Sequence, residues 1–153
     1  MNTMILLNIC LIVHLSGLAL MFGTTVTETV TFNIFSKTFK KGAVPSLNLL
    51  ALMDKLSAVL GIGAAFLILS GTGMMIITHG AFAHQIWFKI KLGLILTLIL
   101  NGFLVGARLK SKLEKQIKEG DQVTDTIGRT KLFFLAQMTL FFTIILLSNF
   151  KFS

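Results

Sequence analysis

Four long apolar stretches, separated by polar and charged segments, constrain the fold of this chain more than any other feature of its sequence. They cover roughly residues 4–25, 56–78, 86–107 and 130–149. A helix of about 20 apolar residues spans the hydrocarbon core of a bilayer, and it satisfies its own backbone hydrogen bonds there. The stretches therefore predict four transmembrane helices.

The composition agrees with a membrane protein. The mean hydropathy is +0.86, 54% of the residues are hydrophobic and only 13% are charged, which lies outside the usual range of soluble domains. No polar segment is long enough to fold alone. We therefore expect residues 1–153 to form a single all-α domain, an integral membrane bundle of four transmembrane helices in contact with membrane lipids.

The net charge of +8 indicates topology rather than nucleic-acid binding. Lys and Arg gather between the first and second stretches and between the third and fourth, whereas residues 79–85 contain neither. By the positive-inside rule, both basic loops face the cytoplasm and both termini lie outside. The sequence thus predicts a multi-pass protein of the cell membrane with no nucleic-acid partner.

Helices one and three are expected to extend into the cytoplasm. The segment TTVTETVTFNIF after the first stretch alternates Val with Thr as a strand does, but an isolated strand would leave its backbone groups unpaired. We therefore expect a helix to about Phe35. The third helix continues through LKSKLEKQIKE, where Leu109, Leu113 and Ile117 form an apolar stripe, and it ends at Gly120.

The second span carries a face of small residues, Ser57, Gly61, Ala64 and Gly71, near helical spacing. Small residues let two helix backbones approach closely, which matters where the hydrophobic effect does not drive helix association. We expect this face to pack against a neighbouring helix.

His14 is an ionisable residue inside the first span. Counting from Thr3 puts it roughly 16 Å deep, at about the level of Ser70, Met138 and Thr139. One interpretation is a neutral imidazole that hydrogen-bonds a neighbour and fixes helix packing. The other is an axial haem ligand or a proton-handling group, because ionisable side chains inside membranes tend to mark functional sites.

Two amides are also expected to meet inside the bundle. Asn101 and Gln137 lie at matching depth on antiparallel helices. Their side chains should touch or share a water and act as an interhelical clamp.

Glu28 returns to nearly the same helical face as His14, closer to the cytoplasm. It either forms a salt bridge with Arg108 or Lys110, or belongs to a proton path toward His14. The sequence leaves both interpretations open.

The segment between the second and third spans contains His79 and His84, preceded by Met74 and Met75. Imidazoles and thioethers bind copper, but this spacing matches no strong metal motif, so His79 and His84 are weak metal candidates and are expected to be interfacial. The chain also lacks a phosphate-binding loop on a strand-helix unit and a nucleophile elbow, which argues against a nucleotide-dependent enzyme or a hydrolase.

Two segments, VHLSGLALMFG and WFKIKLGLILTLILNGFLVGARLKSKL, resemble the HemJ-type protoporphyrinogen oxidases and the related CopD-like domains, which are small four-helix bacterial membrane proteins. The resemblance implies a bacterial inner membrane, haem b as the cofactor, and essential roles for His14 and Lys91. The proline and arginine segment of that family is replaced here by TTVTETVTF, and Asn101 stands where a second histidine is common. Met138 is then the candidate for a second, soft haem ligand.

Three classes of function follow from these features. The first is a non-catalytic interaction subunit or scaffold of a larger membrane assembly, with other membrane protein chains or further copies of itself as partners. The second is a haem- or porphyrin-binding redox protein, an oxidoreductase that uses His14 and Lys91. The third is a transporter or metal-handling protein.

Overall fold

The structure, a computed structural model, describes residues 3–40, 47–81, 85–120 and 122–149. Nearly all of these residues are helical, and none of them forms a β-strand. This confirms the predicted all-α class and the bundle of four long helices.

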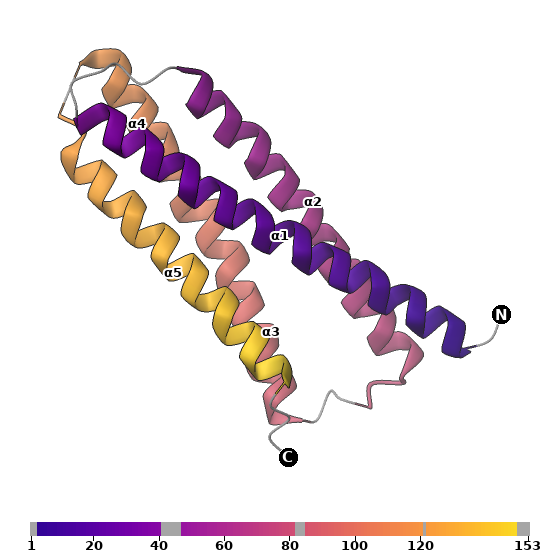
Figure 1. The fold of residues 1–153 in the computed structure, drawn as a ribbon. Helices are drawn as coiled ribbons and strands as arrows, with labels where there is room; N and C mark the ends of the chain where they lie inside the picture. Colours follow the sequence, from indigo (N-terminus) through magenta and orange to yellow (C-terminus); the bar gives the residue numbers. More distant parts are fainter. Residues whose placement is uncertain (1–2, 41–46, 82–84, 121, 150–153) are drawn as a thin grey trace.

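Six helical elements follow one another along the chain: α1 (Thr3–Lys40), α2 (Leu47–Ile77), α3 (Ile86–Leu100), the π-helical segment η1 (Asn101–Gly106), α4 (Ala107–Glu119) and α5 (Thr124–Asn149). Because α3, η1 and α4 are continuous, they form one long rod. Figure 1 shows four rods, each antiparallel to the one before it.

Four described helical stretches are long and apolar enough to cross a membrane: Thr3–Phe39, Ala51–Ile77, Phe88–Glu119 and Thr124–Leu147. Each overlaps one predicted span. Their outward surfaces expose large apolar side chains such as Ile12, Leu69 and Leu135, which in water would be an unfavourable surface and in a bilayer faces lipid. The fold is that of a multi-pass membrane protein.

The Val- and Thr-rich segment of α1 is helical, as expected. Its threonine hydroxyls donate to backbone carbonyls one turn earlier: Thr25 to Met21 at 2.9 Å and Thr29 to Thr25 at 2.7 Å. These bonds satisfy the hydroxyls within the helix itself, so they need no hydrogen-bond partner from outside it. The helix reaches Lys40, somewhat beyond the predicted end near Phe35.

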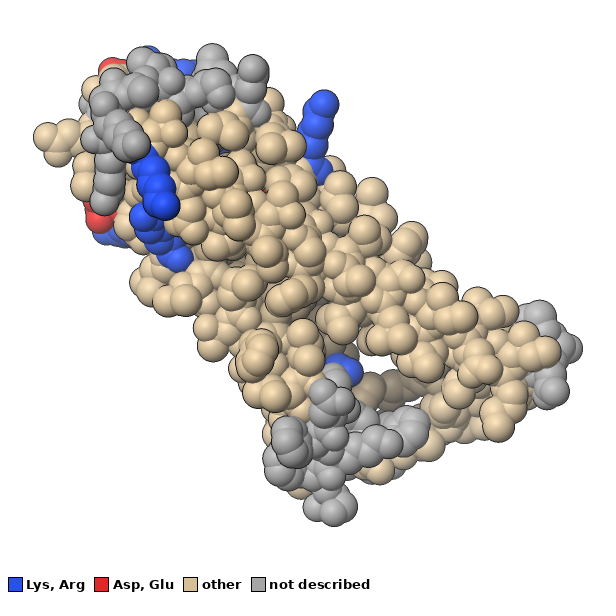
Figure 2. Space-filling view, in the orientation of Figure 1, with Lys and Arg blue, Asp and Glu red and all other residues tan. Residues whose placement is uncertain are grey.

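The third rod extends as predicted to Glu119 and is ended by Gly120. Gly120 adopts φ 72°, in the left-handed region that glycine enters without strain. Leu113 of the predicted stripe is buried, and Ile117 packs beside it against the same core. Lys and Arg gather at this end of the bundle (Figure 2), which we call the basic end.

The closest approach between two helices joins α1 to α2. A Cβ atom added to Gly17 would lie 2.9 Å from the carbonyl oxygen of Gly63, and one added to Gly63 would lie 3.0 Å from the carbonyl oxygen of Gly17. Neither position therefore has room for a side chain. These two glycines set the spacing and register of the pair.

The predicted small-residue face is only partly correct. Ala64 is buried, Ser57 contacts Glu28 of α1 and Gly71 lies beside the His14 ring, but a Cβ on Gly61 would meet nothing within 4 Å. The backbone contact with α1 uses Gly63 instead, which is two residues from Gly61 and so about 200° around the helix. Spacing of small residues alone does not reveal which face a partner helix meets.

The buried apolar residues form two clusters. The cluster near the basic end contains Phe32, Phe35 and Phe134, and the cluster nearer the middle contains Met21, Leu98 and Phe141. Their fully buried members include no residue of α1 before Met21 or of α3 before Leu98, and before these positions only the half-buried Leu18, Leu94 and Ile95 extend the second cluster on these helices. Toward the opposite end, the α1–α2 pair diverges from the α3–α5 pair, and an opening separates them (Figures 1 and 2).

We predict that Gly63→Ala destabilises the protein by about 1–3 kcal/mol, because the added methyl group overpacks the α1–α2 contact. The measurement is the free energy of unfolding by dodecyl sulfate in mixed micelles. Gly93→Ala is the control, since nothing lies within 4 Å of its Cβ position. Equal stabilities of the two variants would contradict the assigned contact.

Candidate functional site

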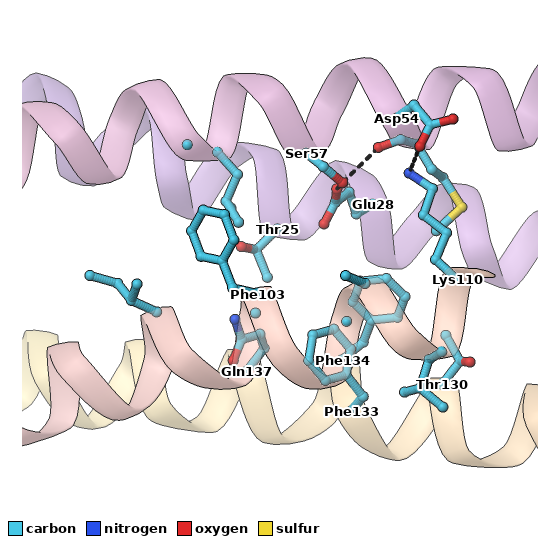
Figure 3. A pocket seen from close by; sticks show the side chains of 18 of the residues that line it. Thr25, Glu28, Asp54, Ser57, Phe103, Lys110, Thr130, Phe133, Phe134 and Gln137 are labelled. Atoms are coloured by element: carbon cyan, nitrogen blue, oxygen red, sulfur yellow. Dashed lines mark hydrogen bonds and ion pairs between the residues drawn. The ribbon is translucent and has the colours of Figure 1, made fainter. Parts of the chain in front are cut away.

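A cavity of about 390 Å³ lies between the α1–α2 pair and the α3–α5 pair. Figure 3 shows its walls, to which α1, α2, η1, α4 and α5 all contribute. Its polar lining residues are Thr25, Glu28, Asp54, Ser57, Lys110, Ser111, Glu114, Thr130 and Gln137. The rest of the lining is apolar, so the cavity combines a hydrophobic wall with a few charged and hydroxyl groups.

Glu28 is buried in this cavity and is 8% exposed. The Ser57 hydroxyl donates to its Oε1 at 3.0 Å. The salt bridge expected between Glu28 and Arg108 or Lys110 is not formed, because Lys110 pairs with Asp54 of α2. The salt-bridge interpretation is therefore wrong, because the fold places Asp54 of α2 beside Lys110 and the order of residues in the chain does not reveal that contact.

Asn101 and Gln137 meet as predicted: Asn101 Nδ2 donates to Gln137 Oε1 at 3.1 Å. Gln137 Nε2 also donates to the carbonyl oxygen of Leu98 at 3.3 Å. The pair joins α5 to the third rod at the first residue of η1. Depth counting identified this contact because the two helices are antiparallel and both continuous.

The π-helical segment η1 forms one wall of the cavity beside this pair. A Cβ on Gly106 would lie 3.0 Å from the Phe133 ring, so the missing side chain lets the ring of α5 pack against the rod. Single π-helical turns often occur at functional sites. Nothing in the sequence distinguishes this turn from the α-helix around it.

His14 hydrogen-bonds Ser70, one of its predicted partners, with 3.0 Å between Nδ1 and the hydroxyl oxygen. The imidazole is half-buried on the α1–α2 pair. Lys91 of α3 is also half-buried and lies within electrostatic range of the ring. The two residues to which the HemJ-type resemblance assigns a role thus lie on different helix pairs and interact through space.

Met138 does not lie level with His14, so it is not a second haem ligand for this histidine. Two ring contacts give the register of α1 against α5. The ring centroids of Phe22 and Phe141 are 6.1 Å apart, and those of Phe32 and Phe134 are 5.5 Å apart. Met138 falls between these levels on the antiparallel α5, about 12 Å or more along the axis from His14. The depth estimate was wrong because it measured α1 and α5 from separate membrane edges.

Of the two weak metal candidates, only one lies within the part of the chain that the structure describes. His79 lies exposed in the turn after α2, whereas His84 is outside the described residues. Within the described parts of the chain, no three His, Cys, Asp or Glu side chains gather as metal ligands.

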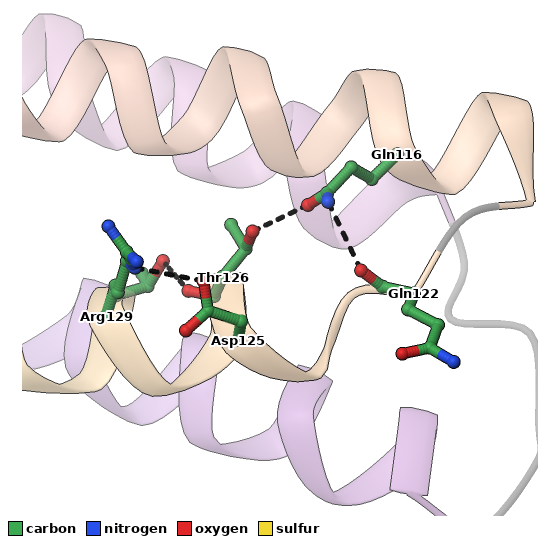
Figure 4. A network of polar contacts seen from close by, with 6 residues as sticks. Gln116, Gln122, Asp125, Thr126 and Arg129 are labelled. Atoms are coloured by element: carbon green, nitrogen blue, oxygen red, sulfur yellow. Dashed lines mark hydrogen bonds and ion pairs between the residues drawn. The ribbon is translucent and has the colours of Figure 1, made fainter.

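A network of polar contacts links α4 to α5 at the basic end of the bundle (Figure 4). Thr126 donates to Gln116 Oε1 at 2.6 Å, and Gln116 Nε2 donates to the carbonyl oxygen of Gln122 at 3.2 Å. Arg129 bonds Asp125 one turn away at 3.0 Å. These contacts tie the two helices across the turn and have no free group directed into the cavity, so we assign them a structural role.

Comparison with protein-family models, with curated proteins and with solved structures finds no match to this chain. Its class is therefore defined by its own fold, which is a multi-pass membrane protein with four long helices. The candidate functional residues of this fold are His14, on which the charge of Lys91 acts, and Glu28 in the cavity.

We predict a favourable coupling energy of about 0.6–1.7 kcal/mol between Asn101 and Gln137, the range measured for hydrogen bonds between membrane helices. The measurement is a double-mutant cycle of Asn101→Ala and Gln137→Ala, read as the free energy of unfolding in mixed micelles. Thr97→Ala paired with Gln137→Ala is the control, because the Thr97 hydroxyl donates within its own helix. Purely additive effects of the first pair would show that the amides do not stabilise the bundle.

Proposed function

We propose that this chain is a membrane protein that binds a haem or porphyrin through His14 and Lys91. The observation that supports this proposal is the position of Lys91, on the third rod, within electrostatic range of His14 on α1. A resemblance between two short segments does not require this charge interaction. A shared ligand would bridge the two helix pairs and contact both side chains.

The side chains fit such a ligand in different ways. Ser70 engages Nδ1 of His14 and holds the ring, which leaves Nε2 as the ligating nitrogen. The ammonium group of Lys91 suits a carboxylate of the porphyrin edge. A haem would supply one-electron redox chemistry, and the protein would provide one axial ligand, since Met138 is too distant.

The distribution of Lys and Arg gives the proposed orientation of the protein in the membrane. The basic end lies in the cytoplasm and both termini lie outside, as the positive-inside rule requires. His14 and Lys91 then belong to the outer half of the bundle, and the cavity with Glu28 to the cytoplasmic half. A bacterial inner membrane is the location that the HemJ-type resemblance implies.

A second candidate function is that of an interaction subunit in a larger membrane assembly. The observation that favours it is a set of exposed helix glycines outside the cavity whose Cβ positions meet nothing within 4 Å: Gly23, Gly93 and Gly128. Open glycines allow close approach of a helix from another chain or another copy. The two candidate functions predict different results on purification: a protein that binds haem, or a colourless protein that co-purifies with other chains.

We predict that the protein purified in mild detergent shows a Soret band, and that His14→Ala abolishes it by removing the axial ligand. Lys91→Gln should weaken haem retention by about ten- to a hundredfold, because a charge-assisted hydrogen bond contributes about 1.5–3 kcal/mol. The measurement is the visible spectrum after titration with haem.

The matched controls are His79→Ala and Lys89→Gln, which change an exposed histidine and an exposed lysine outside the proposed site. Both should keep the spectrum of the unchanged protein. A colourless protein that does not take up haem and co-purifies with other chains at fixed stoichiometry would refute the first proposal and support the second.

A further inference from the structure

The cavity between the two helix pairs contains one carboxylate that has no cation partner of its own. Asp54 is paired with Lys110, and Glu114 with Lys118 at 2.8 Å. Within the described ranges Glu28 forms no salt bridge, and Lys110 acts on it only through space. With each ion pair counted as neutral, an ionised Glu28 would leave the cavity lining with one unmatched negative charge.

The hydrogen bonding around Glu28 compensates little of the cost of burying a charge. Ser57 has one hydroxyl proton, and its oxygen lies 3.0 Å from Glu28 Oε1 and 2.9 Å from the carbonyl oxygen of Met53. The proton is therefore shared between two acceptors. A buried carboxylate normally requires a cation or several donors, so a positively charged ligand would complete this arrangement.

The opposite wall suits the apolar part of such a ligand. Phe103 of η1 and Phe133 and Phe134 of α5 line the cavity from the other helix pair (Figure 3). Aromatic faces attract cations, and more strongly so away from water. Phe103 is 65% exposed and the Asp54 side chain is 69% exposed, so the cavity reaches the surface of the bundle beside them.

We propose that this cavity binds a monovalent organic cation, an apolar body with one protonated amine or quaternary ammonium group, and that Glu28 supplies the counter-charge. Its volume of about 390 Å³ lies within the range of small-molecule pockets. An inorganic divalent ion fits less well, because such ions take about six oxygen ligands and the described residues hold no three acidic or imidazole groups together. His14 and Lys91 do not line this cavity, so the inference is independent of the haem proposal.

Equilibrium dialysis of the purified full-length protein in dodecyl maltoside tests the proposal, with radiolabelled tetraphenylphosphonium as the probe. Tetraphenylborate has the same shape and the opposite charge. We expect the phosphonium to bind and the borate to bind at least about tenfold more weakly, because only the cation complements Glu28. This comparison uses the unchanged chain, so it holds even if a variant fails to fold.

Variants of single carboxylates then test whether Glu28 supplies the counter-charge for the cation. Glu28→Gln should weaken phosphonium binding at least about tenfold, and Glu28→Asp should bind more tightly than Glu28→Gln. Asp125→Asn, which removes an exposed carboxylate outside the cavity, should leave the affinity unchanged. Absence of phosphonium binding, equal binding of the borate, or an unchanged affinity in a folded Glu28→Gln variant would each overturn the proposal.

Discussion

The approach of α1 to α2 at Gly17 and Gly63 is the contact on which the other features of the structure depend. Two backbones that meet without intervening side chains can slide little, so one contact sets the register of the whole antiparallel pair. In that register Ser57 lies opposite Glu28, and Ser70 lies opposite His14. His14 and Glu28 thereby each receive a hydroxyl partner from α2, which limits the cost of placing them inside a membrane.

The second pair of rods meets the first mainly at the basic end and in the middle of the bundle. Phenylalanine contacts join α1 to α5 there, while Asn101 and Gln137 hold α5 to the third rod. Membrane helices gain little from the hydrophobic effect and associate where side chains fit and polar groups pair. The cavity and the opening are the places where the two pairs do not fit each other, and the candidate sites lie there.

Several contacts were predictable from the sequence because they need only helical geometry. His14 with Ser70 and Asn101 with Gln137 follow from counting residues along continuous antiparallel helices. The same counting failed for Met138, since α1 and α5 were measured from different membrane edges and their register is set by phenylalanine packing. The salt bridge considered between Glu28 and Lys110 does not form, because Lys110 pairs with Asp54 of α2.

The sequence by itself determined the four apolar helices, the helical continuation of the Thr-rich segment and the end of the third rod at Gly120, because each depends on local hydropathy, backbone satisfaction or the conformational freedom of glycine. The interaction of Lys91 with His14 through space, the π-helical turn and the cavity around Glu28 were decided only by the tertiary structure. They depend on which faces of two helix pairs meet and how far the pairs diverge. Residue spacing within one helix carries no information on either quantity.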